Sequence, residues 1–312
     1  MRRTFAAALN KVSVISVPIN LGQPSLGLDQ APAKLIENGL VKLLGDIGWR
    51  WKIVPPLIDD IKFGRDLRSY EDINAKNCLQ VGTVSEVIKR GVLEQCKEDT
   101  FPLILGGDHC ISIGTISAIR AAQPNTAVVW VDAHADINTP QTSISGNMHG
   151  MPLGFLLGQV PNAAQLPGFQ WFQPCLSPKD VVYIGLRDLD KAEKLMIKRL
   201  GIKAFTMYDI DRLGIGKVME ETLAYIGDRN IHLSFDIDGI DPFFAPHTGT
   251  AVTGGLSFRE GNYVCEALAD SKRLTSMELV EVDPSQHKNM SSSQTIDVAL
   301  TLIGSAMGQR IL

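Results

Sequence analysis

Three residues of metal-binding type stand close together in segment 131–140, VDAHADINTP: Asp132, His134 and Asp136. They alternate with apolar residues and follow the apolar run 126–130, which predicts a buried strand. At strand period, residues i, i+2 and i+4 share one face, so two carboxylates and an imidazole converge near the strand's carboxyl end. Burying this cluster alone is costly, and a bound cation would remove the cost.

Two other predicted strands end in the same way. Segment 104–110, ILGGDHC, places His109 after a pair of glycines that permit a close backbone turn. Segment 233–242, LSFDIDGIDP, places Asp236 and Asp238 at the i, i+2 spacing. A single histidine or aspartate at a strand end is usually a hydrogen-bonded structural group. Its repetition at three strand ends favours a metal site made of His109, Asp132, His134, Asp136, Asp236 and Asp238.

The ligand types indicate which metal would bind. Four carboxylates and two imidazoles make a hard, oxygen-rich site that suits Mn²⁺ better than zinc. Six ligands with four formal negative charges suit two dications better than one. Paired ions about 3.5–4 Å apart lower the pKa of bound water toward ~7 and provide hydroxide for attack on an electrophilic carbon.

Apolar runs alternate with helical patterns along the whole chain, which predicts an α/β fold with a parallel sheet. We expect one domain over residues 1–312, as a three-layer αβα sandwich; a barrel is the alternative. Segment 57–80 is polar and predicts a surface excursion. The predicted strands are 12–18, 51–55, 101–107, 126–132, 180–186, 202–207, 231–237 and 276–282, and the predicted helices are 31–46, 83–98, 111–122, 149–158, 190–200, 215–226, 259–270 and 291–308.

The overall composition excludes several classes of protein. A net charge of −4 gives no basic field for nucleic acid, and no apolar run approaches the ~20 residues of a membrane span. No GxGxxG opens a helix after the first strand, which argues against dinucleotide binding. Five scattered cysteines suit a reduced interior. Residues 1–11 are basic and form either a short mitochondrial leader or an ordinary N-terminus, so we expect the cytoplasm or the mitochondrial matrix.

Several motifs together resemble the ureohydrolases: GGDHCISIGTI, WVDAHADINTP, SGNMHG, SFDIDGIDP and EVDP. The SGN turn, INTP, YIGLRDLD and HTGTAVTGGLSFREG resemble the arginases of animal type in particular, and the resemblance runs from Val12 to near the C-terminus. It implies an eight-stranded parallel sheet, a binuclear Mn²⁺ centre and a homotrimer. It also implies hydrolysis of L-arginine to L-ornithine and urea by a metal-bridging hydroxide, a reaction of arginine metabolism and the urea cycle.

The resemblance also implies roles for individual residues. One ion would be held by His109, Asp132, Asp136 and Asp236, and the other by Asp132, His134, Asp236 and Asp238. His149 matches the proton shuttle, since an imidazole near neutrality suits proton delivery to a leaving amine. Glu281 would accept a bidentate hydrogen bond from the guanidinium, with Thr250 orienting that glutamate.

The amino-acid end of the substrate would be bound by the loop after the second metal-binding strand. Asn138, Ser145 and Asn147 would contact the α-carboxylate, with Ser143 adding a contact through water, and Asp190 would recognise the α-amino group. Each residue alone is an ordinary loop residue. Together they distinguish an arginase from an agmatinase, whose substrate lacks the carboxylate.

Some positions depart from the family pattern or concern assembly. Cys110, Met151, His247 and Asp283 replace more usual residues, and Asp283 adds negative charge near the site. Inter-subunit ion pairs would involve Arg259, Glu260 and Glu266, at positions that otherwise fit a solvated helix start.

Three alternative functions compete with that of an arginase: a ureohydrolase of another guanidino substrate, a deacetylase of related fold, and a non-catalytic metal-stabilised protein. The presence of His149, Glu281 and the full ligand set argues against the last.

Overall fold

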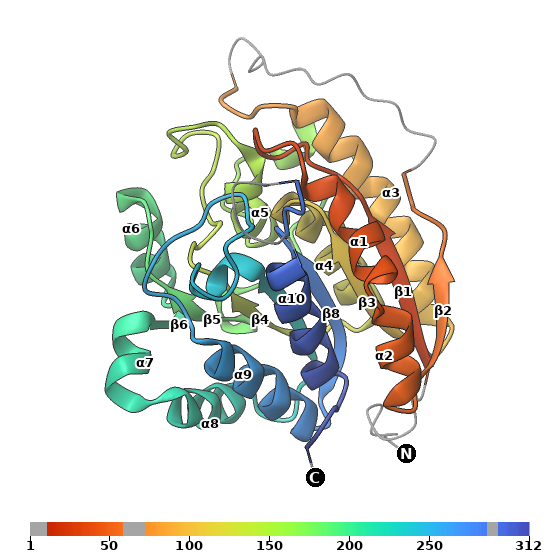
Figure 1. Ribbon diagram of the computed structural model, residues 1–312. Coiled ribbons are helices and arrows are strands. Elements are labelled where there is room, and N and C mark those ends of the chain that lie inside the picture. Colours follow the sequence, from red (N-terminus) through yellow and green to blue (C-terminus); the bar gives the residue numbers. More distant parts are fainter. Residues whose placement is uncertain (1–10, 59–72, 286–292, 312) are drawn as a thin grey trace.

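The computed structural model describes residues 11–58, 73–285 and 293–311. Its centre is a sheet of eight parallel strands in the order β2-β1-β3-β8-β7-β4-β5-β6 (Figure 1). The predicted parallel α/β fold is confirmed, and an open sheet replaces the alternative barrel. The strands are β1 (Lys11–Val17), β2 (Arg50–Val54), β3 (Phe101–Gly106), β4 (Ala127–Val131), β5 (Val181–Leu186), β6 (Lys203–Thr206), β7 (Ile231–Asp236) and β8 (Leu274–Val280).

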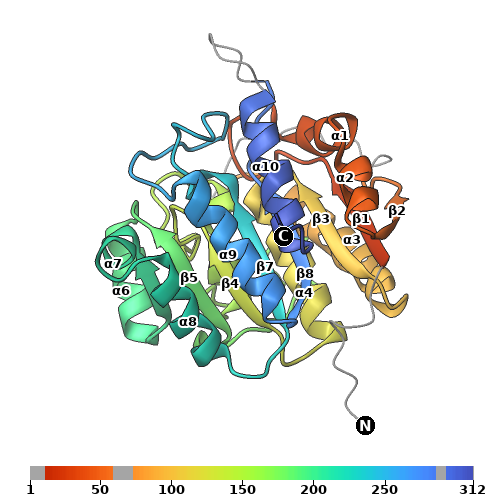
Figure 2. The same ribbon diagram turned by 60° about the horizontal axis from the view of Figure 1, so that its bottom comes forward.

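Helices cover both faces of the sheet, which makes three layers. The helices are α1 (Ala31–Glu37), α2 (Leu40–Asp46), α3 (Cys78–Lys97), α4 (Ser112–Ala122), α5 (Pro152–Leu156), α6 (Lys191–Leu200), α7 (Met207–Leu213), α8 (Ile215–Ile226), α9 (Phe258–Asp270) and α10 (Ser293–Ala306). Figure 2 shows α8, α9 and α10 across one face, with α1 and α2 beside them. Alternate strand residues build the two cores: Val129 and Val131 face the layer with α8–α10, whereas Val128 and Trp130 face the layer with α3–α5.

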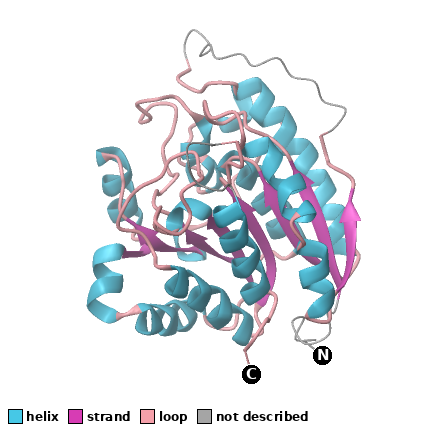
Figure 3. Cartoon of the chain, viewed as in Figure 1, coloured by secondary structure: helices cyan, strands magenta, loops and turns pink. Residues whose placement is uncertain are grey.

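The two central strands of the sheet, β7 and β8, are the last two strands in the sequence. The chain builds β1–β3 on one side, continues with β4–β6 on the other, and then inserts β7 and β8 between β3 and β4. In open α/β sheets, ligands bind beyond the carboxyl ends of strands where the strand order reverses. Figure 3 shows loops gathered at that edge of the sheet.

Two predicted helices and one helix that the sequence did not predict differ from expectation for physical reasons. The helix expected over 31–46 is broken at Gly39, whose φ of 104° no helix interior allows. The helix expected over 149–158 is reduced to α5, which starts with Pro152. Helix α7 was not predicted, although Thr206 and Asp209 form a capping box at its start.

Two other expectations fall partly outside the described residues. These are the basic segment 1–11 and the excursion 57–80, of which residues 1–10 and 59–72 are not described. The end of that excursion does not stay irregular, because α3 begins at Cys78.

Candidate metal centre and substrate pocket

The strand register aligns the acidic residues at the centre of the sheet. Val131 pairs with Phe235, so Asp132 and Asp236 come next in neighbouring strands. His109 reaches the same point from the turn after β3. That turn passes so close to the β1 loop that a Cβ on Gly107 would lie 1.6 Å from Ile19 O, so only glycine fits there.

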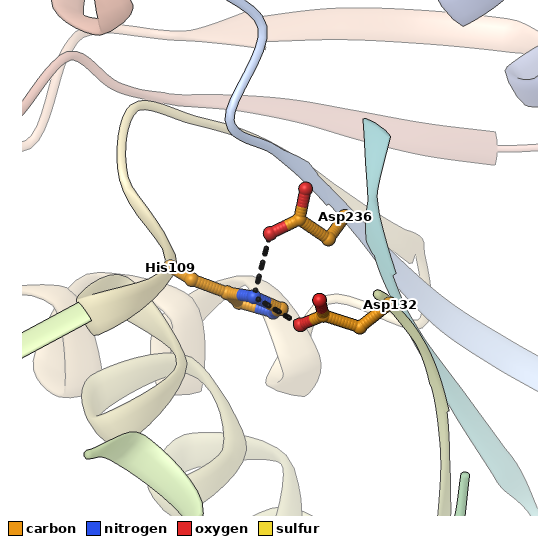
Figure 4. Close-up of side chains that lie close together, drawn as sticks. All are labelled: His109, Asp132 and Asp236. Atoms are coloured by element: carbon orange, nitrogen blue, oxygen red, sulfur yellow. Dashed lines mark ion pairs between the residues drawn. The ribbon is translucent and has the colours of Figure 1, made fainter. Parts of the chain in front are cut away.

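The imidazole of His109 points into a group of three carboxylates. Its Nδ1 lies 3.2 Å from Asp132 Oδ2 and 3.1 Å from Asp236 Oδ2 (Figure 4). The same nitrogen lies 3.2 Å from Asp136 Oδ2. The ring is completely buried and stacks on Trp130, with centroids 4.0 Å apart. Because Nδ1 is buried without a hydrogen-bond partner, this nitrogen and the surrounding acid oxygens fit a bound cation.

A second triad adjoins the first and shares one of its residues. His134 Nδ1 lies 3.1 Å from Asp238 Oδ2 and 3.4 Å from Asp132 Oδ1. Two sets of possible ligand atoms therefore exist, namely His109, Asp132, Asp236 and Asp132, His134, Asp238. The structure brings all six predicted ligands together.

The electrostatics of this cluster reflect its unbalanced negative charge. Burial, together with the charges of Asp238 and Asp132, holds the pKa of Asp236 well above its ordinary value. Although burial opposes the charged imidazole, the surrounding carboxylates of Asp132, Asp136 and Asp236 hold the pKa of His109 well above its ordinary value. Without a dication to supply positive charge, Asp236 and His109 therefore retain their protons to higher pH.

A pocket opens from the metal cluster toward solvent. It is lined by His134, Asp136, Asn138, Ser143, Ser145, Asn147, His149, Gly150, Asp188, Asp190, Glu193 and Thr250. The predicted contacts for the amino-acid end of the substrate therefore share one cavity with the predicted proton shuttle. Asn138 Nδ2 donates to Asp190 Oδ2 at 2.9 Å, which links the two expected recognition elements.

His149 is held by the loop that follows β1. Its backbone nitrogen donates to Gly22 O at 3.2 Å, and its Nδ1 lies 3.0 Å from the same oxygen. The ring is therefore anchored at one nitrogen while the residue lines the pocket.

Glu281 lies deeper than the pocket, with 1% of its surface exposed. Its Oε1 accepts from His109 N at 2.8 Å, and its Oε2 accepts from Gln23 Nε2. The φ of Glu281 is positive, at 65°, and so is that of Asp136, at 49°. Strained backbone at two non-glycine residues of one site is typical of positions fixed for function.

The expected partner of Thr250 is wrong. Thr250 Oγ1 donates to Asp238 Oδ2 at 3.0 Å, so it orients a metal-ligand candidate rather than Glu281. Loop geometry explains the difference, because Arg187 donates to Val252 O and Asp238 O and thereby ties the Thr250 loop to the end of β7.

Sequence reasoning missed several residues of the site. Asp188 and Glu193 line the pocket; Asp188 has the same i, i+2 spacing from Asp190 that identified the metal ligands. Gln23 and Lys76 come from segments without a polar pattern on a strand, so no sequence signal pointed to them. Asp283, by contrast, was expected near the site; it is buried and accepts from Ser25 Oγ at 2.7 Å.

The expected interface residues make contacts within this chain. Arg259 Nη1 donates to Glu266 Oε1 at 2.8 Å, and Glu260 completes a capping box with Ser257 at the start of α9.

The comparisons with known proteins agree with this geometry. A model of the "Arginase family" matches residues 10–308. The chain belongs to the arginase family. It is 43% identical to Arginase-1 of Oryctolagus cuniculus, covering 95% of this chain and 92% of that protein. The predicted family and hydrolase class are confirmed.

Solved arginase structures share the fold over nearly the whole chain. The arginase of Bacillus caldovelox superposes with a TM-score of 0.89 at 39% identity, covering 97% of this chain and 99% of that one. The arginase of Entamoeba histolytica, solved in complex with L-ornithine, gives a TM-score of 0.85 at 33% identity, covering 96% and 99%. In the described part of the chain, no helix is long and apolar enough to cross a membrane.

Proposed function

We propose that this chain hydrolyses L-arginine to L-ornithine and urea and that it uses two Mn²⁺ ions. The observation that carries the proposal is the pair of ligand triads that share Asp132, at the inner end of a pocket lined by four carboxylates. The hard, oxygen-rich donor set favours Mn²⁺. When bound, the ions supply Lewis acidity, which makes hydroxide available near neutral pH.

The side chains of this protein would hold and orient the substrate. Asp190 and Asn138 offer an acceptor and a donor to the α-amino and α-carboxylate groups, and Ser145 and Asn147 extend the contacts to the carboxylate. Glu281 would accept the guanidinium N–H groups, in place of the amide that Gln23 now donates to it.

Proton transfer falls to His149 in this proposal. As the carbon–nitrogen bond of the guanidinium breaks, the leaving amine nitrogen of ornithine needs a proton. His149 lines the pocket, and the ring nitrogen not held by Gly22 O is the one placed to donate it.

The decisive experiment compares two substrates on chelated and reloaded enzyme. We expect Mn²⁺-dependent urea release from L-arginine and little from agmatine, which lacks the α-carboxylate. Release from agmatine alone would indicate the agmatinase alternative. No urea from either substrate, despite bound metal, would overturn the proposal.

Assembly and compartment are also proposed. We propose a homotrimer in which Arg259, Glu260 and Glu266 form ion pairs between subunits. Light scattering at rising ionic strength tests this proposal, because salt weakens such pairs.

The described cysteines are all free thiols, which supports a reducing compartment such as the cytoplasm or the mitochondrial matrix.

A further inference from the structure

The charges of the pocket suit only part of an amino-acid substrate. Its lining includes Asp136, Asp188, Asp190 and Glu193 but neither lysine nor arginine among the described residues. A guanidinium and an α-amino group are attracted by such a lining. An α-carboxylate is repelled unless a cation lies close behind the wall.

Lys76 places a cation behind that wall. Its Nζ donates to Asn147 Oδ1 at 3.1 Å, and Asn147 lines the pocket. Lys76 also borders a second hollow on the far side of Asn147, together with Gly22 and Gln23. Among the described residues, no carboxylate forms an ion pair with Lys76.

The hydrogen bond determines which half of the Asn147 amide faces the substrate. A lysine ammonium has only donors, so it can bind the amide through Oδ1 alone. The Nδ2 group, which has two donors, is then left for the pocket, where a carboxylate would accept from it. Without Lys76, the amide can rotate by 180° and present its oxygen to the carboxylate instead.

The backbone around Lys76 is fixed to the same loop. Lys76 N donates to Gly146 O at 2.8 Å, and Asn74 Nδ2 donates to Ser143 O at 2.6 Å. Gly146 has a φ of 70°, and a Cβ there would lie 2.3 Å from Asn74 Oδ1.

The segment that contains Lys76 is also connected to the loop that anchors His149. Asn77 Nδ2 donates to Leu21 O in that loop at 2.7 Å.

We propose that Lys76 is a positioning residue that determines specificity for substrates with an α-carboxylate. It orients the Asn147 amide and supplies the positive charge that the lining lacks. This inference rests on the proposed function, because it assumes that the carboxylate of L-arginine lies against the 143–147 loop.

The test compares two ligands that differ only in the carboxylate. Binding of L-ornithine and of 1,4-diaminobutane to Mn²⁺-loaded enzyme is measured by calorimetry for the wild type, Lys76→Met, Lys76→Gln and Lys76→Arg. For Lys76→Met we expect about tenfold weaker binding of L-ornithine, equal to about 1.4 kcal/mol, with diaminobutane changed less than about twofold. Lys76→Arg should restore most of the difference and Lys76→Gln only part, since Gln donates without charge. KM for L-arginine should rise with kcat nearly constant.

The outcomes separate the inference from the proposed function. Equal weakening of both ligands, or of neither, overturns the role of Lys76. The matched control Lys217→Met removes an exposed lysine on α8 that pairs with Glu220 and should leave both affinities unchanged. Failure of the wild type to release urea from L-arginine would instead overturn the proposed function, whatever the binding ratios.

Discussion

Ser234 Oγ lies 2.9 Å from His109 Nε2, the ring nitrogen that does not face the carboxylates. The same hydroxyl donates to Glu278 Oε1 at 2.7 Å, so it accepts from His109. His109 then carries its proton on Nε2, and Nδ1 presents a lone pair to the metal site. Glu278 Oε1 also accepts from Ser112 at 2.6 Å, whereas its Oε2 is buried without a hydrogen-bond partner.

Removing that hydroxyl should weaken metal binding without removing a ligand. We expect Ser234→Ala to lower Mn²⁺ affinity about 10- to 100-fold, because the tautomer of His109 is no longer fixed. Titration calorimetry on the chelated protein measures the change. The control is Ser85→Ala, which changes a buried serine of helix α3. Equal affinities in both variants would contradict the role of Ser234.

Metal removal should destabilise the fold. Asp132, Asp236 and Asp238 stay buried without a cation, so the chelated protein should melt at a lower temperature. Mn²⁺ at a hundred times its Kd should restore about 2.7 kcal/mol of unfolding free energy per site. Calorimetric melting with Mn²⁺ and with Mg²⁺ tests this expectation, and identical melting curves with and without Mn²⁺ would contradict it.

His149 should affect turnover more than binding. We expect His149→Asn to lower kcat by about 100-fold or more, because the leaving amine loses its proton donor, while KM for L-arginine changes little. Gly22→Ala is a less specific probe, since its Cβ would lie 2.8 Å from His149 N and 2.6 Å from Asp108 Oδ1. A dominant change in KM would argue that His149 binds substrate instead.

Glu193 should give the protein a specific dependence of stability on pH. Burial raises the pKa of Glu193 from 4.5 to about 7, and 5% of its surface is exposed. Between these values the folded state retains a proton that the unfolded chain releases, so stability falls as pH rises from about 4.5 to 7.

The size of the effect has an upper limit of about 3 kcal/mol, from 1.36 kcal/mol per pKa unit. Glu193→Gln should flatten this slope, and its amide oxygen retains one acceptor for Asp190 N or Ile137 N. Urea denaturation at pH 5 and pH 7.5 measures the difference between wild type and variant. Parallel slopes would show that Glu193 does not titrate in this range.

The sequence predicted the parts of the structure that depend on periodicity. Period-2 spacing located Asp132, His134 and Asp136, although β4 ends at Val131 and the three residues lie in the loop that follows it. Apolar runs located the strands, because strands of a parallel sheet are buried on both faces. The metal ligands were therefore found one strand at a time, before the sheet order was known.

The periodicity of the sequence could not predict contacts between distant loops. The break at Gly39 depends on a left-handed backbone in a segment with a continuous helical pattern. Thr250 selects Asp238 because Arg187 places its loop, and Gln23 reaches Glu281 across 258 residues of sequence. Lys76 was missed because nothing in its local sequence records that it packs against Asn147.

The strand order has a consequence for how the protein is made. Ribosomal synthesis delivers β1–β6 first, with His109 and Asp132 separated by the space that β7 and β8 later occupy. A nascent chain that ends before Ile231 has two half-sheets and no shared edge between them. The full set of metal-ligand candidates can therefore come together only near the end of translation. We therefore expect metal capture to be a late folding event that requires release of residues 231–312 from the ribosome.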